Sequence, residues 1–241
     1  MMDKNLPDRL KNLFVIDIET VSQFDSYESL PERFKKLWET KYSYTDAKEP
    51  VEDFYFNKAG IFAEFGKVIV ISVGFYFLKE NNKIGLRVKT LFGEEKDILL
   101  EFKALLTEKV KNKNVILCAH NGKEFDFPYL SRRFIANGIQ LPKWLDLSGK
   151  KPWEIPHLDT LELWKFGDRK NYTSLELLAA VFDLPTSKTD LHGSDVNKVF
   201  YQNKDVERIA KYCAKDVALT AKIFLKMNFL EGLNEEDIEF I

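Results

Sequence analysis

The chain has 241 residues, of which 45% are hydrophobic and 31% charged, so it can bury the core of one large folded domain. Its 36 basic and 38 acidic residues give a formal net charge of −2, which argues against a protein that coats nucleic acid regardless of sequence, since such proteins carry a basic excess. No apolar run approaches the roughly 18 residues of a membrane-spanning helix, and the first residues lack the apolar core of a signal peptide. We therefore expect a cytoplasmic location and no membrane partner.

The first half of the chain predicts strands followed by a helix. A short apolar run at 13–18 predicts a buried strand, and a nearly continuous apolar run at 67–77 predicts a second, longer one. Residues 85–91 alternate and predict a third strand, joined to the second by a turn at 80–83. Helical spacing of apolar residues follows over 94–111.

The second half predicts one more strand and three helices. The strand is expected at 114–119, and the helices at 127–137, 173–182 and about 205–227, with Thr173 and Glu176 as a candidate capping box. Cys118 and Cys213 fall inside these elements without the spacing of a metal site, which favours buried, reduced thiols. Strands alternating with helices in this order are typical of an α/β domain with a mixed sheet, and we expect one domain over 1–241.

Two segments fall outside this scheme. Residues 22–66 are dense in aromatic side chains, and residues 139–171 carry three tryptophans among prolines and charges. Both are too apolar for disorder. Each is either a helical insertion that packs on the edge of the sheet or a wall of a substrate groove.

The first predicted strand carries two carboxylates at the spacing of a metal site. Asp17 and Glu19 are two residues apart, so both side chains point to one face of the strand. Two converging carboxylates repel each other unless a cation lies between them, and oxygen ligands select Mg²⁺ or Mn²⁺ over zinc. The plainer interpretation is a strand end at which Asp17 caps a turn.

Two further carboxylates lie at sequence positions that suit a site. Asp126 follows the Asn121-Gly122 turn between a predicted strand and a helix, at the edge where open α/β sheets place their sites. Asp216 lies in the last predicted helix, one turn after Tyr212, so the two share a face. The alternatives are a helix cap for Asp126, and a partly exposed Asp216 beside a tyrosine that only packs its ring.

Together these segments match a known set of motifs. Asp17-x-Glu19, Asn121-x-x-x-Phe125-Asp126 and Tyr212-x-x-x-Asp216 occur in the order of the three exonuclease motifs. The chain thus resembles the DEDD superfamily of 3′→5′ exonucleases, in its tyrosine subtype (DEDDy), which includes the proofreading domain of family B DNA polymerases. Within that subtype it resembles the stand-alone predicted bacterial exonucleases related to that domain. The histidine subtype would place a histidine at position 211, which is a lysine here.

The resemblance implies a fold, a reaction and cofactors. The fold would be ribonuclease H-like, with a mixed central sheet flanked by helices and an aromatic-rich insertion at about 22–66. The reaction would be hydrolysis at the 3′ end of single-stranded or frayed DNA, releasing nucleoside 5′-monophosphates with the help of two divalent cations, Mg²⁺ or Mn²⁺. Because only 25 residues follow Asp216, we expect any polymerase or repair partner to act in trans.

The resemblance also implies a role for each motif residue. Asp17 would bridge both cations, Glu19 and Asp216 would complete the ligands of the first, and Asp126 would hold the second. The Tyr212 hydroxyl would position the attacking water. The expected substrate contacts are Thr20, Asn121 and Phe125. Two rivals stay open: a 3′→5′ exoribonuclease, and a nuclease-fold module that binds nucleic acid without catalysis, although the complete motifs count against the second.

Other polar and aromatic residues have a functional and a plainer interpretation. His120 is either a substrate contact or a hydrogen-bonded histidine at a strand end, and residues 192–195 are a turn and helix cap or a phosphate-binding loop. The aromatic residues of 22–66 stack on bases or pack together. Four basic side chains either contact the backbone of a nucleic acid strand or are solvated: Arg132, Arg133, Arg169 and Lys170.

Overall fold

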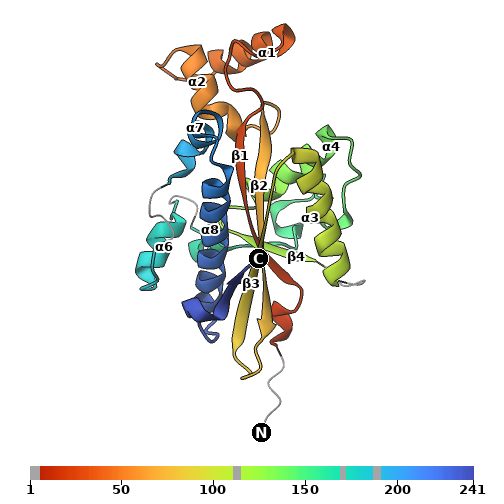
Figure 1. The fold of residues 1–241 in the computed structure, drawn as a ribbon, viewed down its shortest axis with the longest axis vertical. Coiled ribbons are helices and arrows are strands. Elements are labelled where there is room, and N and C mark those ends of the chain that lie inside the picture. The colour runs from red at the N-terminus through yellow and green to blue at the C-terminus, as the bar shows by residue number, and fades with distance from the viewer. Residues whose placement is uncertain (1–5, 111–114, 169–171, 187–190) are drawn as a thin grey trace.

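A mixed sheet forms the centre of the protein. The computed structural model describes residues 6–110, 115–168, 172–186 and 191–241 (Figure 1). Within these residues the sheet has six strands in the order β5-β4-β1-β2-β3-β6. The strands are β1 (Leu13–Ser22), β2 (Gly66–Leu78), β3 (Ile84–Phe92), β4 (Ile116–Ala119), β5 (Leu158–Asp159) and β6 (Ile238–Phe240). Antiparallel pairing joins β1, β2 and β3, and parallel pairing adds β4, β5 and β6.

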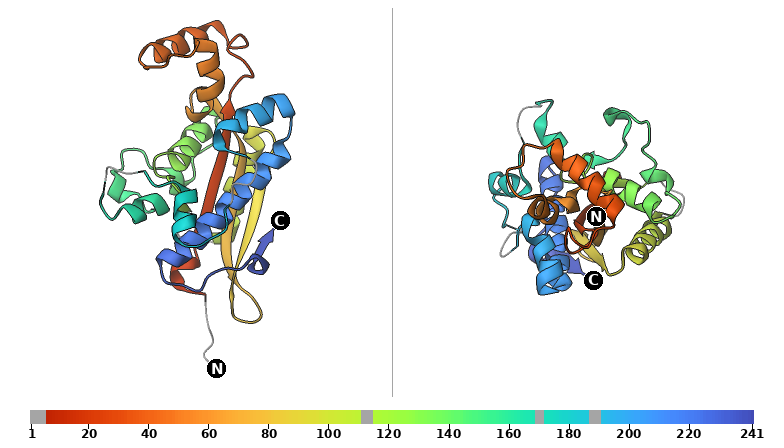
Figure 2. Two further views of the ribbon diagram at one scale, coloured as in Figure 1. Left: turned by 90° about the vertical axis from the view of Figure 1, so that its left-hand side faces the viewer. Right: turned by 90° about the horizontal axis from the view of Figure 1, so that it is seen from above.

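Helices cover both faces of this sheet. On one face lie α3 (Glu95–Val110) and α4 (Asp126–Ala136), and on the other α8 (Val206–Met227) runs across β1, β2 and β3 (Figure 2). Smaller helices are α5 (Thr160–Lys165), α6 (Leu175–Val181), which packs on α8, and α7 (Val196–Lys198). This architecture confirms the expected α/β fold with a mixed central sheet flanked by helices.

Strand β1 supplies residues to the cores on both faces. Ile16 and Ile18 pack in the core with α3 and α4, whereas Val15 packs in the core with α8. Helix α8 lies close to the sheet because Gly74 of β2 has no side chain: a Cβ there would stand 2.8 Å from the Val217 methyl. The strand continues four residues beyond the predicted end, and its register with β2 shifts between Glu19 and Thr20. Such a bulge re-aims the side chains that follow it.

The segment between β1 and β2 folds into two helices, α1 (Glu32–Ser43) and α2 (Val51–Lys58), which project beyond the ends of these strands (Figure 1, top). Their aromatic residues form a separate hydrophobic cluster around the fully buried Trp38. The Trp38 ring lies 5.0 Å from that of Phe65 and 5.2 Å from that of Tyr55. Most aromatic residues of this insertion therefore pack with one another.

Most predicted elements are found within a few residues of their expected bounds, and four features of the structure differ from the predictions. Strands β5 and β6 are too short to show a period, and α5 was not predicted in the proline-rich segment. The cap of α6 is Ser174, whose hydroxyl accepts from the Leu177 N–H, so the predicted Thr173 capping box is wrong. Positions 111 and 114, at predicted element ends, lie outside the described residues.

Arg133 corrects another prediction, because it is neither solvated nor aimed at a substrate strand. It lies 7% exposed on α4, where its guanidinium forms an ion pair with Glu95 of α3, 2.6 Å away, and donates to the Ala63 carbonyl at 2.9 Å. Arg132 is exposed, and Arg169 and Lys170 lie outside the described residues.

The structure also bears on the predictions about the cysteines and about membrane-spanning helices. Cys118 and Cys213 are free and fully buried, which confirms their interpretation. Across the described ranges, no helix combines the length and apolar character that crossing a bilayer requires.

Candidate active site

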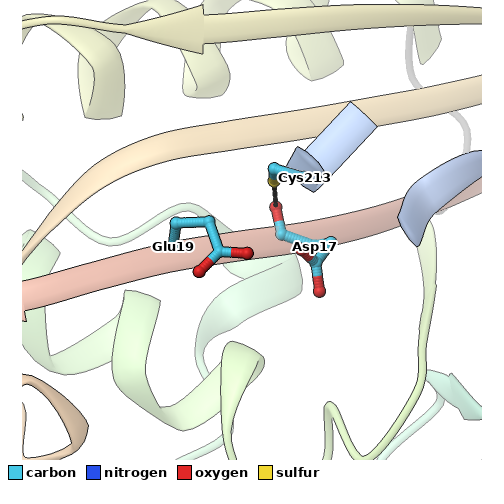
Figure 3. Close-up of side chains that lie close together, drawn as sticks. All are labelled: Asp17, Glu19 and Cys213. Carbon is cyan, nitrogen blue, oxygen red and sulfur yellow. Dashed lines mark hydrogen bonds between the residues drawn. The ribbon is translucent and has the colours of Figure 1, made fainter. Parts of the chain in front are cut away.

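The fold brings four carboxylates to one place. Asp17 and Glu19 lie on β1 beside α8, Asp216 comes from the middle of α8, and Asp126 is the first residue of α4. Figure 3 shows Asp17 and Glu19 beside Cys213, and ligand atoms of these three lie within 4.8 Å of one another. Glu19, Asp126 and Asp216 are each less than a tenth exposed. Residues separated by up to 199 positions thus form one buried acidic cluster.

Asp17 is at the electrostatic centre of this cluster. The residue keeps some contact with solvent, but its Oδ2 atom is shielded and has no hydrogen-bond partner among the described residues. Burial raises the pKa of the Asp17 carboxyl well above its ordinary value, and the negative charges of Glu19, Asp126 and Asp216 raise it further. A buried carboxylate with negative neighbours is costly to ionise, and a bound cation would reverse that cost.

Asp126 is held against β1 from the other side. Its Oδ1 accepts a hydrogen bond from the Ile18 backbone N–H at 3.2 Å, which orients the carboxyl toward the strand that carries Asp17 and Glu19. Burial raises the pKa of Asp126 to about 7, with a further contribution from the charge of Asp159. This contact shows that Asp126 does more than begin a helix.

Tyr212 faces the same cluster from α8. Its hydroxyl is hydrogen-bonded to Asp216, one helical turn later. Burial raises the pKa of Tyr212, and the charges of Asp216, Glu19 and Asp17 raise it further, so the hydroxyl stays protonated at neutral pH. The tyrosine therefore packs its ring in a hydrophobic cluster between α8 and the sheet, which includes Val21 and Val70. Its hydroxyl also presents a hydrogen-bond donor to the carboxylates.

Cys213 also lies at the site, although the sequence analysis interpreted it only as a buried thiol. Its Sγ donates to the Asp17 backbone carbonyl at 3.3 Å. Burial, followed by the charges of Asp17 and Glu19, raises the pKa of Cys213 well above its ordinary value, so it remains a thiol. The negatively charged groups available to a cation here are carboxylates, which suit Mg²⁺ or Mn²⁺ better than a thiolate-binding metal.

A buried aspartate absent from the sequence interpretation holds the loop before Asp126. Asp159 of β5 accepts from the backbone N–H of Asn121 at 2.9 Å and of Lys123 at 3.0 Å, and it caps α5 through the Leu161 N–H at 2.9 Å. Asn121 has a left-handed φ of 65°, which asparagine tolerates better than most residues. A cap signature, aspartate three residues before Glu162, could have revealed Asp159.

Glycine is required next to Asn121. A Cβ at Gly122 would lie 2.4 Å from the Ala119 side chain at the end of β4. The loop therefore passes directly over the strand end, as the sequence pattern Asn-Gly between strand and helix suggests.

The other two expected substrate contacts meet at a residue that the sequence did not single out. The Thr20 side chain is hydrogen-bonded to the Tyr129 hydroxyl, and the Phe125 ring lies 5.3 Å from the Tyr129 ring. Tyr129 in turn donates to the Gly60 carbonyl at 2.8 Å. Thr20 and Phe125 thus contact the same residue, Tyr129, which is hydrogen-bonded to the insertion at Gly60.

The two histidine segments have structural partners. The ring of His120 is hydrogen-bonded to the Thr160 hydroxyl at 2.9 Å and to the Thr173 carbonyl at 3.0 Å, which fits a hydrogen-bonded histidine at a strand end. Residues Gly193–Asp195 form a short 3-10 helix, and the Asp195 carboxylate accepts from the His192 N–H at 3.3 Å. These contacts agree with the plainer interpretation of both segments.

The sheet order and the flanking helices define a ribonuclease H-like α/β fold, and this fold carries the cluster of four carboxylates described above. Residues 62–239 match a family described as predicted 3′-5′ exonucleases related to the exonuclease domain of PolB. This range is most of the chain, so the protein belongs to that family. Asp17 and Glu19 precede the matched residues, and the structure places them beside Asp126 and Asp216, which lie within the match.

Individual relatives agree with this assignment. The chain is 24% identical over 153 residues to a DNA polymerase of Pyrococcus glycovorans, covering 58% of this chain and 19% of that protein. It is 25% identical over 179 residues to DNA polymerase 1 of Pyrococcus abyssi, covering 66% and 22%. The structure of the family B DNA polymerase from Pyrobaculum calidifontis superimposes with a TM-score of 0.51 at 13% identity, covering 90% of this chain and 24% of that one. The last likeness shows the fold, and the chain spans about a fifth of the length of the curated relatives.

Proposed function

We propose that the protein is a metal-dependent 3′→5′ exonuclease that removes nucleotides from the 3′ end of single-stranded or frayed DNA and releases nucleoside 5′-monophosphates. One observation carries the proposal: four carboxylates from three distant segments converge around a shielded Asp17 oxygen that has no hydrogen-bond partner among the described residues. A fold gains nothing from such repulsion by itself, which supports a site built for cations.

The donor set fits two divalent cations. Asp17 would be the shared ligand, Glu19 and Asp216 would complete the ligands of one ion, and Asp126 would hold the other. When bound, Mg²⁺ or Mn²⁺ would activate water as a nucleophile and stabilise charge on the leaving oxygen. Asp126 is already held against β1 by the hydrogen bond from the Ile18 N–H.

The side chains have separate tasks in the proposed hydrolysis. The protonated Tyr212 hydroxyl, held by Asp216, would orient the attacking water through a hydrogen bond. Thr20, Asn121 and Phe125 would contact the terminal nucleotides, with Phe125 offering a ring for stacking. Asp159 would keep the Asn121 loop in place through its backbone hydrogen bonds. Water attacks phosphorus directly, so no covalent enzyme intermediate is needed.

Digestion of end-labelled oligonucleotides tests the proposal. With Mg²⁺ or Mn²⁺, a 5′-labelled DNA strand should shorten stepwise, a 3′-labelled strand should release labelled mononucleotide at once, and EDTA should stop both. RNA of the same sequence, run in parallel, should be degraded more slowly. An Asp17→Asn, Asp216→Asn double variant, purified identically, controls for contaminating nucleases. Equal activity of this variant, or mononucleotide released first from the 5′ end, would contradict the proposal.

A further inference from the structure

The insertion between β1 and β2 leaves part of its apolar surface exposed, although most of its aromatic residues pack together. The structure describes all of residues 22–66, and their exposed large hydrophobic side chains are Phe34, Leu37, Tyr44 and Ile61. None of the four belongs to α2. The exposed apolar surface of the insertion is therefore confined to α1, the residue that follows it and the turn that leads into β2.

Three of these side chains belong to one surface. Phe34 and Leu37 are three residues apart on α1, so they lie on the same side of this helix. That side rests on the segment that carries Ile61, because the Phe34 ring lies 6.0 Å from the ring of Phe65, four residues after Ile61. We call Phe34, Leu37 and Ile61 the apolar face of the insertion.

The apolar face adjoins the candidate active site. Ile61 ends a short 3-10 helix, Ala59–Ile61, which lies against β1: a Cβ at Gly60 would stand 3.1 Å from the backbone of this strand. The Gly60 carbonyl accepts from the Tyr129 hydroxyl, to which Thr20 is hydrogen-bonded, and Thr20 directly follows one of the four carboxylates. In both views of Figure 2, α1 lies on the same side of the molecule as α4, which begins with another of them. A strand that ends at the carboxylates can therefore continue onto the insertion.

One cation accompanies the apolar face. Lys41 lies one turn after Leu37 on α1, and its Nζ atom lies 3.8 Å from the centroid of the ring of Phe62, the residue after Ile61. Within the described residues no carboxylate forms an ion pair with Lys41, and the positions three and four residues before and after it hold no acid. A cation beside apolar and aromatic side chains is a combination found in proteins that bind single strands.

Unpaired nucleotides fit this surface better than a duplex or another protein does. A duplex hides the flat faces of its bases and presents phosphates, for which an apolar face with one cation offers little. A stable protein–protein interface buries about 800 Å² on each partner, far more than three half-exposed side chains provide. A single strand presents base faces and phosphates together. Phe34 and Lys41 are seven residues apart, which corresponds to about 10 Å of helix, or about three nucleotides at roughly 3.4 Å each.

We propose that the apolar face of the insertion binds the bases of about three unpaired nucleotides that precede the 3′ end of a DNA strand, and that Lys41 binds a phosphate among them. This inference rests on the proposed function for the position of the 3′ end. The contacts lie away from the bond that is cleaved, so they hold the substrate and the transition state equally and act on affinity rather than on kcat.

Binding of a fluorescent single-stranded DNA of about 12 nucleotides, measured by anisotropy in EDTA, tests this surface without turnover. The test variant carries Leu37→Ser and Ile61→Ser, and it leaves Phe34 in place against the insertion core. Loss of two aliphatic contacts should raise Kd roughly 10- to 30-fold. In Lys41→Gln the plot of log K against log salt should flatten by about 0.7, the contribution of one phosphate of a single strand, whereas Lys96→Gln, at an exposed position of α3, should not change it.

The aliphatic substitutions have a matched control and a conservative counterpart. Leu100→Ser with Ile135→Ser removes two exposed aliphatic side chains from α3 and α4, and this control should bind like the wild type. Leu37→Met with Ile61→Met keeps an apolar side chain at both positions and should keep the wild-type Kd. Melting temperatures of all variants check the fold.

Substrate length separates a binding role from a general defect of the site. With Mg²⁺ or Mn²⁺, the test variant should hydrolyse the long strand with a higher KM and the wild-type kcat. It should hydrolyse a dinucleotide like the wild type, because a dinucleotide at the carboxylates does not reach the insertion. The proposal is overturned if the test variant binds the long strand like the wild type, if the control loses as much affinity, if a blunt duplex loses as much affinity as the single strand, or if hydrolysis of the dinucleotide falls equally.

Failure of the apolar face and failure of the proposed function give different results. Degradation of DNA by the wild type, with normal binding of DNA by the test variant, overturns the apolar face alone. Binding in EDTA that depends on Leu37 and Ile61, without hydrolysis by the wild type in any divalent cation, supports the apolar face and overturns the exonuclease.

Discussion

Replacing Asp126 by asparagine should make the metal-free protein more stable at alkaline pH. In the folded protein, burial raises the pKa of Asp126 from 3.8 to about 7, so the folded state holds this proton more tightly than the unfolded chain. The associated stability is fully present below pH 3.8 and is lost as the pH rises through about 7. At about 1.36 kcal/mol for each pKa unit, the loss amounts to about 4 kcal/mol.

Asparagine does not ionise, and its oxygen can still accept from the Ile18 N–H. The variant should therefore exceed the wild type by up to about 4 kcal/mol at pH 8 in EDTA and equal it near pH 4. For a chain of this length the difference at pH 8 corresponds to an increase in Tm of about 10 °C. The same substitution should remove exonuclease activity, because it removes a proposed ligand.

Thermal unfolding of both proteins in EDTA, from pH 4 to pH 8, measures this effect. Adding Mg²⁺ or Mn²⁺ at pH 8 should stabilise the wild type more than the variant and close the gap, since the cation offsets the carboxylate repulsion. The reasoning is refuted if the asparagine variant melts at or below the wild-type temperature at pH 8 without metal. A Tm difference that does not change with pH would refute it as well.

Three further outcomes are expected. Tyr212→Phe should lower kcat by roughly ten- to a thousand-fold with little change in KM or Tm, because it deletes only the hydroxyl, and a fully active variant would remove the tyrosine from the mechanism. Asp17→Ala should abolish turnover and leave Tm in EDTA unchanged or higher, and substantial residual rate in Asp17→Ala and Asp216→Ala would show that the site is misassigned. Burial lowers the pKa of His157 from 6.5 to about 4, and the Nδ1 atom of its ring accepts a hydrogen bond from the Leu117 N–H. Denaturant titrations should therefore show that up to about 3 kcal/mol of stability is lost as the pH falls from 6.5 to 4. The His157→Gln variant should lack this loss.

The local pattern of the sequence was sufficient to predict most helices and strands. The apolar run at 13–18, its two carboxylates at alternate positions and the long amphipathic helix each leave a periodic signal, because burial on one side selects residues at the period of the element. The same rule predicted that Asp17 and Glu19 share a face, and that Tyr212 and Asp216 do. Elements of two or three residues, such as β5 and β6, are too short for a period and were missed.

Long-range packing decided the rest. The sequence does not specify that Asp216 lies near Asp17. The distance between these two residues depends on α8 crossing the sheet at Gly74, where the absence of a side chain leaves room for Val217. It also left Arg133 as a surface cation, because only the fold brings Glu95 and the Ala63 carbonyl around it. A residue's neighbours along the chain determine its element and face, whereas its electrostatic partners come from segments that the sheet topology brings together. The sequence by itself therefore determined which residues could form the site, and the tertiary structure alone decided which charges meet there.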